Sequence, residues 1–237
     1  MANVEIDGVN SIVYTDQVDP KTGTTLTIGT SGDTVNLGTG VTAGTGFGGD
    51  LSFGGDTFGA NKVIGANDAY SFSLETSGNT ALTIDANGHV TMPLQSSFCA
   101  TLSSTMSNVP INDSTVWIEA DTEIWDLNSD WNTTTYTFTA PVTGKYHFHA
   151  RVQVLQMDSA GANDFVLNTS NVVNVYMESF SANVFAADGT RVFGGSVIMD
   201  MDANDTAKFR FYQGGGTAQA DINDGQAATA VSGYLLH

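Results

Sequence analysis

Hydrophobic and polar residues alternate between residues 131 and 154 in a pattern that predicts two antiparallel strands. Before the turn, aromatic residues alternate with threonines up to Ala140, and residues 141–144 supply Pro and Gly. After the turn every second residue is apolar, namely Tyr146, Phe148, Ala150, Val152 and Val154. A period of two is typical of a strand with one buried face. The stretch therefore predicts a β-hairpin that contributes one aromatic face to a core.

The same alternation recurs along residues 94–237, with turn residues between the segments, and no amphipathic helix is predicted there. The expected strands are residues 98–102, 115–119, 123–126, 136–139, 145–155, 172–180, 184–186, 191–199, 206–212 and 228–236. About ten short strands in one domain are typical of an antiparallel sandwich or jelly roll. The predicted fold class is therefore all-β, with surface loops at residues 157–163 and 213–226.

Residues 1–93 differ in composition from the rest of the chain. They hold 16 of the 26 glycines but only 6 of the 23 aromatic residues, so the large core is expected in residues 94–237. Pro93 and the small polar residues after it mark the expected boundary. Two domains are predicted, an N-terminal appendage over residues 1–93 and a globular knob over residues 94–237.

Two segments of the appendage are alike, residues 23–38 and 78–93. Each predicts two short strands around a Gly-containing turn, and a hairpin of that size is too small to bury a face alone. Neighbouring copies of the chain could supply the missing partners in an extended, trimerising β stem. A flexible Gly-rich linker is the alternative interpretation of residues 1–93.

The charge balance excludes several classes of partner. Lys and Arg total 7 against 25 Asp and Glu, a formal net charge of -18, which disfavours nucleic acid and anionic membranes. No run approaches the roughly 18 apolar residues of a membrane helix, so membrane insertion is not expected. One cysteine excludes an intrachain disulfide, and the first residues lack a signal-peptide pattern, so we expect synthesis in the cytoplasm.

Several segments resemble the C1q/TNF-like jelly roll over about residues 98–236. They are Phe98-Cys-Ala-Thr-Leu, Ile124-Trp-Asp, Tyr136-Thr-Phe-Thr-Ala-Pro-Val-Thr-Gly-Lys-Tyr-His-Phe, Gly195-Ser-Val-Ile-Met and Val231-Ser-Gly-Tyr-Leu-Leu. Asn204 and Thr137 stand where the family has Gly, and Asn tolerates a left-handed turn almost as well. The resemblance implies a compact homotrimer in which aromatic residues form either the core or the seam between subunits. The candidates are Phe98, Tyr136, Phe138, Tyr146, Phe148, Phe211 and Tyr234.

The Thr-rich segments at residues 24–40 and 81–93 resemble repeats in bacteriophage fibre and tail-fibre proteins. In front of a trimeric knob they imply a virion protein: a head fibre, a capsid decoration or a short tail fibre that adsorbs to the host. Such a protein would bind itself, a capsid or tail protein and, through the knob, a host-surface glycan. The alternative is a glycan-binding adhesion module of a bacterial surface or spore coat.

Catalytic motifs are not found, and a non-enzymatic protein is expected. No Gly-x-Ser-x-Gly, phosphate-binding loop or HExxH is present, and Cys99 is interpreted as a small core residue. A hydrolase of host polysaccharide would need paired carboxylates, but no pair stands out among the many aspartates. His147 and His149 share one strand face and could bind a metal, or they could form a polar face with Arg151 and Gln153.

Acidic turns near the C-terminus suggest calcium as the one cofactor candidate. Asp200, Asp202 and Asp205 begin like a calcium loop, and Asp221 and Asp224 form a second acidic cluster. The first cluster fails as an EF-hand, because Asp205 occupies the Gly position and Phe211 the closing Glu position. Solvated turns are the alternative to calcium binding at either cluster.

Overall fold

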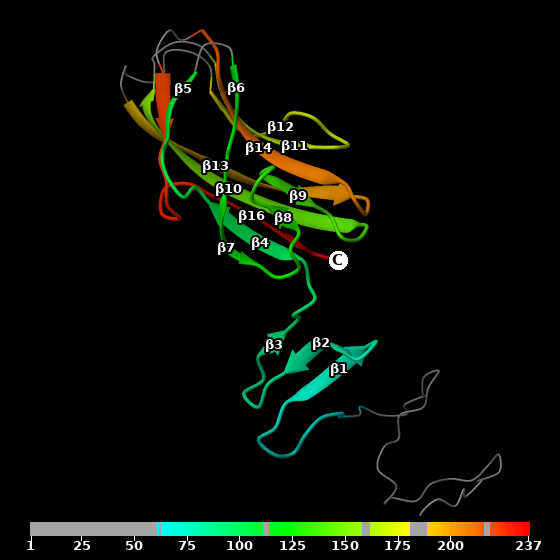
Figure 1. Ribbon diagram of the computed structural model, residues 1–237. Coiled ribbons are helices and arrows are strands. Elements are labelled where there is room, and N and C mark those ends of the chain that lie inside the picture. Colours follow the sequence, from blue (N-terminus) through cyan, green and yellow to red (C-terminus); the bar gives the residue numbers. More distant parts are fainter. Residues whose placement is uncertain (1–60, 62, 111–113, 158–161, 181–188, 216–218) are drawn as a thin grey trace, which may run out of the picture. The chain divides into compact units, whose positions relative to one another are not determined.

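A computed structural model describes residues 61, 63–110, 114–157, 162–180, 189–215 and 219–237 (Figure 1). These residues form antiparallel sheets and no helix, which confirms the all-β prediction. The strands are β1 Phe72–Thr76, β2 Asn79–Ile84, β3 Val90–Thr91, β4 Ser97–Thr101, β5 Met106–Pro110, β6 Ser114–Trp117, β7 Thr122–Asp126, β8 Trp131–Asn132, β9 Thr137–Thr139, β10 Gly144–Met157, β11 Asn163–Thr169, β12 Val175–Phe180, β13 Gly189–Met201, β14 Thr206–Gln213, β15 Gln219–Ile222 and β16 Ala230–Leu235.

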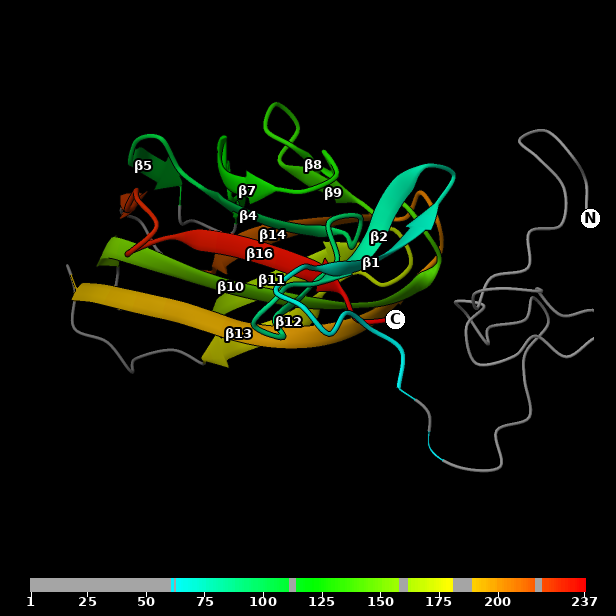
Figure 2. The same cartoon turned by 90° about the horizontal axis from the view of Figure 1, so that it is seen from below.

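The knob is a sandwich of two sheets (Figures 1 and 2). The first sheet, called here the β10 sheet, has the order β5-β15-β10-β16-β4-β7, with β13 on the other edge of β10. The second, called the β14 sheet, has the order β12-β11-β14-β9-β8, with β6 also paired to β14. Chain neighbours such as β10 and β11 lie in different sheets, which is the connectivity of a jelly roll rather than of a meander.

Strand β10 organises the knob because it pairs along both edges. It runs antiparallel to β13 from Gly144 to Met157, and on its other edge it pairs first with β16 and then with β15. Its burial alternates as the sequence predicted, with Tyr146, Phe148, Ala150, Val152 and Val154 all fully buried. The strand therefore contributes one whole face to the core and the opposite face to the surface.

The core is a continuous aromatic stack between the sheets. Phe98 of β4 lies 4.8 Å from the Trp131 ring and 5.1 Å from the Phe138 ring, nearly parallel to both. Phe138 continues edge-on to Phe148, and Phe148 contacts Phe209 of the β14 sheet. Offset and edge-to-face pairs at these separations add to the free energy of burial.

Four strands of the knob were not predicted, namely β5, β8, β11 and β15. In β11 the three residues Phe165, Val166 and Leu167 are all buried, so the strand shows no alternation by which it could be found. The loop expected at residues 213–226 is partly wrong, because residues 219–222 form β15 with Ala220 and Ile222 buried. The strand expected at residues 184–186 lies outside the described residues.

The two residues that depart from the family pattern, Asn204 and Thr137, lie in a turn and at the start of strand β9. Asn204 adopts φ +74°, so it takes the left-handed turn conformation that the sequence predicted for it. The backbone N–H of Asn204 donates to the Ala140 carbonyl at 2.8 Å, which ties the turn to the connection between β9 and β10. The β-hairpin expected over residues 131–154 is wrong, because β9 pairs with β8 and β14 whereas β10 lies in the other sheet. Tyr136 also has a positive φ, +55°, so strand β9 begins one residue later than expected, at Thr137.

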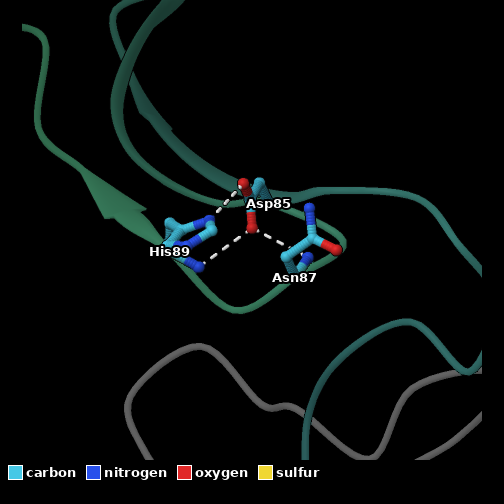
Figure 3. Close-up of polar contacts among 3 residues, drawn as sticks. All are labelled: Asp85, Asn87 and His89. Carbon is cyan, nitrogen blue, oxygen red and sulfur yellow. Dashed lines mark hydrogen bonds and ion pairs between the residues drawn. The ribbon is translucent and has the colours of Figure 1, made fainter.

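Two compact units divide the chain, Met1–Lys62 and Val63–His237, and the segment expected at residues 23–38 lies outside the described residues. The matching segment at residues 78–93 does form two short strands, β2 and β3, and β1 adds a third that was not predicted. Asp85 closes the turn between β2 and β3, with Oδ1 accepting from the backbone N–H of Asn87 and His89 at 2.8 and 2.9 Å (Figure 3). These bonds and the His89 side chain lower the pKa of Asp85.

Candidate functional site

The outward face of the β10 sheet, called here the outer face, is the main candidate for an interaction surface. Its strands β13, β10, β16, β4 and β7 lie side by side (Figure 2). One row across it contains Ile198, His147, Tyr234 and Ser97, and the next contains Ser196, His149, Ser232, Cys99 and Trp125. A third row contains Gly194, Arg151, Ala230 and Thr101. The rows follow from the strand registers, since paired residues share a face.

Large apolar side chains are exposed on this face. Ile198 is 57% exposed, and Val192, Tyr234 and Trp125 are each 45% exposed. None of the three rows contains Asp or Glu, although the chain carries 25 of them. The Lys145–Asp200 ion pair borders these rows beside Ile198. A cluster of exposed apolar side chains inside a polar border is typical of a surface that another protein covers.

The seven aromatic candidates separate clearly between the core and the outer face. Phe98, Phe138, Tyr146, Phe148 and Phe211 are fully buried within the sandwich. Tyr136 is partly buried against the core, and Tyr234 alone of the seven lies on the outer face. Burial raises the pKa of Tyr146, whose hydroxyl donates to the Val142 carbonyl at 2.7 Å.

Sequence reasoning did not single out Val192, Ile198 and Trp125 on the outer face. A signal for two of them was present: in residues 191–199, Val192 and Ile198 occupy the opposite phase from Phe193, which is buried. A strand with apolar residues in both phases is expected to be covered on both faces. Only the sheet registers show that Ile198 lies in one row with His147 and Tyr234, that Trp125 lies in the row of His149, and that Val192 lies opposite Gln153.

His147 and His149 share the outer face with Arg151 and Gln153, as the sequence predicted. The His147 ring packs against Tyr234, and its Nδ1 atom is buried without a hydrogen bond. Across the described ranges no group of three or more His, Cys, Asp or Glu residues is placed to hold a metal ion. A metal on this pair would therefore need ligands from outside the described part of one chain.

Asp200 and Asp202 of the first acidic cluster line a hollow of about 350 Å³ near the C-terminus. Asp200 forms an ion pair with Lys145, and Asp202 accepts a bond from Thr143. Asp205 accepts bonds from the Ser170 hydroxyl at 2.8 Å, from the backbone N–H of Asp202 at 2.7 Å and from Asn171. The bond from Ser170, followed by that from Asp202, lowers the pKa of Asp205. The three carboxylates are thus tied to different partners within the turns.

The second acidic cluster is split between a strand and a turn. Asp221 lies on β15 and accepts a bond from the backbone N–H of Asn108 at 2.8 Å, which corrects its placement in a loop. Asp224 lies in the following turn and accepts a bond from the Thr105 hydroxyl at 2.6 Å. Calcium binding at either cluster stays a prediction.

Cys99 is buried on β4, and burial raises the pKa of its thiol. A thiol with a raised pKa forms little thiolate at neutral pH, which disfavours a nucleophilic role. Within the described residues the protein also has no helix with the length and apolarity needed to cross a bilayer.

The strand order and the sandwich core define an antiparallel jelly-roll module. Residues 97–236 match the C1q domain family, and the chain belongs to that family. The match covers nearly the whole knob.

Solved structures with the same fold span about 60% of this chain. The globular domain of zebrafish complement 1qA protein is 20% identical with a TM-score of 0.44, over 98% of its own length. Murine APRIL at pH 5.0 is 10% identical with a TM-score of 0.45, over 99% of its length. Eiger TNF from S. frugiperda is 13% identical with a TM-score of 0.43, over 92% of its length. No curated protein matches this chain.

Proposed function

We propose that this chain is a bacteriophage virion protein, a homotrimeric fibre or capsid decoration that presents its C1q domain as an exposed adhesion knob. Residues 1–93 would form the stem that trimerises and attaches to a capsid or tail protein. The role is structural and adhesive rather than catalytic. The single observation that carries the proposal is the apolar outer face of the β10 sheet, which in one copy of the chain faces solvent.

The chemistry of the outer face favours a second and third copy of the same chain as its cover. The full chain carries a net charge of -18, so copies should repel one another unless a surface free of carboxylates brings them together. The three central rows contain no carboxylate, and the nearest one beyond Ile198 on the same face, Asp200, is neutralised by its ion pair with Lys145. Closed symmetry is the usual outcome for identical chains, and the C1q family membership makes three the expected number.

The sheet β1-β2-β3 supports the stem hypothesis because apolar side chains on it and just after it are left in solvent. Leu74, Val90, Met92 and Leu94 are each about half exposed, from 48% to 56%. Three short strands with apolar side chains left in solvent are marginal on their own. Packing against the same strands of two further copies would bury these side chains.

The mass of the full chain in solution tests the trimer. Size-exclusion chromatography with light scattering at micromolar concentration should give three times the 24.8 kDa chain mass. A mass of one chain would contradict the trimer, whatever the location of the protein.

The virion assignment needs a separate experiment. Phage particles purified from the host that encodes this chain should contain it, and antibody against the knob should label intact particles at the capsid or the tail. Its absence from purified particles, or its presence on uninfected cells or spores, would instead favour the bacterial adhesion module.

A further inference from the structure

We propose a saccharide-binding site on the outward face of the β14 sheet, on the opposite side of the knob from the outer face of the β10 sheet. The site is a hollow of about 370 Å³ over strands β6, β11, β12 and β14, between the side chains of Trp117 and Tyr176. It deepens the proposed adhesion function by naming the surface and the chemical class of its ligand.

The strand registers explain how the hollow is built. Val166 of β11 lies opposite Tyr176 of β12 on one side and Arg210 of β14 on the other, and Arg210 lies opposite Trp117 of β6. Val166 points away from the core, because its neighbours Phe165 and Leu167 belong to the core, yet it is fully buried. The side chains around Val166 therefore cover it and form a floor, with one aromatic residue at each side.

Two exposed aromatic rings give the site its apolar contacts. Tyr176 is 58% exposed and Trp117 is 38% exposed. The Nζ atom of Lys208 lies 5.5 Å from the centre of the Trp117 ring. Sugar rings have apolar C–H faces that pack on aromatic rings, while their hydroxyls stay available for hydrogen bonds.

Polar groups on the floor are already held in place. Arg210 donates through Nη2 to the Asn174 side-chain oxygen at 2.6 Å, and the Asn168 side-chain oxygen accepts from the Asn174 backbone N–H at 3.1 Å. Asp164, on the same hollow, accepts a bond from the Ser179 hydroxyl. A guanidinium has five N–H donors, so the bond to Asn174 leaves others for a ligand. Fixed donors and acceptors beside aromatic rings suit a polyhydroxylated ligand.

The hollow carries a cationic group in a strongly acidic protein. Lys208 and Arg210, two of the seven Lys and Arg residues of the chain, lie two positions apart on the outward face of β14. Arg210 and Asp164 line the hollow and give the site both signs of charge, while Lys208 adjoins it beside the Trp117 ring. The site can therefore take a neutral sugar through its hydroxyls or a uronate sugar through Arg210, which matches carboxylates in a bidentate manner.

Binding is tested with the full chain on a printed array of bacterial and plant oligosaccharides, half of them neutral and half containing uronate. We expect at least one oligosaccharide to bind, and its Kd is then measured by titration. Tyr176→Ala and Arg210→Ala should each raise that Kd at least tenfold. Arg210→Lys keeps the positive charge but loses the planar guanidinium group. Its Kd should lie between those of the parent chain and Arg210→Ala only if the bound sugar is a uronate.

Tyr70→Ala is the matched control, because Tyr70 is 74% exposed and lies outside the knob, and it should leave Kd unchanged. Binding to no member of the array would overturn the proposal, as would binding that neither Tyr176→Ala nor Arg210→Ala weakens. The mass of every variant in solution is also measured, so that failure of sugar binding can be distinguished from failure of the proposed trimer. A trimer that binds no sugar contradicts the saccharide site alone, and a monomer that binds contradicts the trimer alone.

Discussion

His147 and Tyr234 lie directly opposite each other on strands β10 and β16, with ring centres 5.1 Å apart. The next pair along the same strands is Phe148 and Gly233, and both are fully buried in the core. One step along the two strands thus moves from an exposed surface pair to a core pair. Because the sheet is pleated, side chains at these adjacent positions point to opposite faces of it.

Tyr234→Asp and Ile198→Asp should each convert the proposed trimer to monomers. Both side chains lie in one row of the outer face, and three added carboxylates would meet in a seam where burial of charge is costly. Light scattering measures the mass, and circular dichroism should show an unchanged β-sheet spectrum because both positions are exposed in one chain.

Tyr176→Asp is the matched control for this trimer experiment, since Tyr176 is also an exposed tyrosine, 58% against 45% for Tyr234, and lies on the opposite sheet. It should remain a trimer. If Tyr234→Asp and Ile198→Asp also stayed trimeric, the copies would have to meet elsewhere and the outer face would lose its proposed role.

Gly233→Ala should destabilise the knob by about 1–3 kcal/mol, the usual range for overpacking a core. A Cβ atom at Gly233 would lie 2.7 Å from Cδ1 of Phe148 and 2.8 Å from Cε1 of Phe98. Both rings belong to the aromatic stack and have little room to move. Chemical denaturation measures the change in the free energy of unfolding.

Gly65→Ala controls for the loss of glycine flexibility, because no atom lies within 4 Å of a Cβ placed there. It should leave the free energy of unfolding of the knob unchanged. Equal stability of Gly233→Ala and the parent chain would mean that the rings of Phe98 and Phe148 are packed more loosely than described.

Asp205→Asn should lower the melting temperature at neutral pH, and the difference should shrink as the pH falls. The pKa of Asp205 is lowered in the folded chain, so its ionised form adds stability above the unfolded pKa, near 3.9. That contribution is lost as the pH drops through the lower, folded pKa. Thermal melts between neutral pH and about pH 2.5 measure it.

Asp68→Asn removes the same charge at an exposed position and separates the local effect at Asp205 from the change in net charge. It should change the melting temperature less than Asp205→Asn does at neutral pH. A gap between Asp205→Asn and the parent chain that stays constant down to pH 2.5 would argue that packing, rather than the ionised carboxylate, is responsible.

Calcium binding at the acidic clusters predicts a melting temperature that falls when EDTA removes the ion, because a ligand bound only to the folded state stabilises it. Asp202→Asn should abolish the calcium-dependent part if the first cluster binds, and Asp224→Asn should abolish it if the second does. Identical melting temperatures in calcium and in EDTA would exclude calcium at both clusters and leave solvated turns.

Much of the fold was predictable because local patterns carry it. The alternation at residues 145–155 and the Pro-Gly turn before it indicated a long strand with a buried aromatic face, which is β10. The left-handed conformation of Asn204 also followed from the family's Gly at this turn and the tolerance of Asn for that conformation. Strand β11 could not be found in this way, because Val166 is buried by Tyr176, Arg210 and their neighbours, which come from other strands.

By itself the sequence determined the all-β class, the resemblance to the C1q family and the acidic character that disfavours nucleic acid as a partner. These conclusions were possible because alternation with a period of two, turn residues and charge can be read from the chain without knowing which segments pair. Only the tertiary structure decided which aromatic residues form the core and that Tyr234 belongs to the outer face. It also brought Trp117 and Tyr176 to either side of one hollow, although they are far apart in the chain. Strand register sets both outcomes, and register depends on pairings between distant segments.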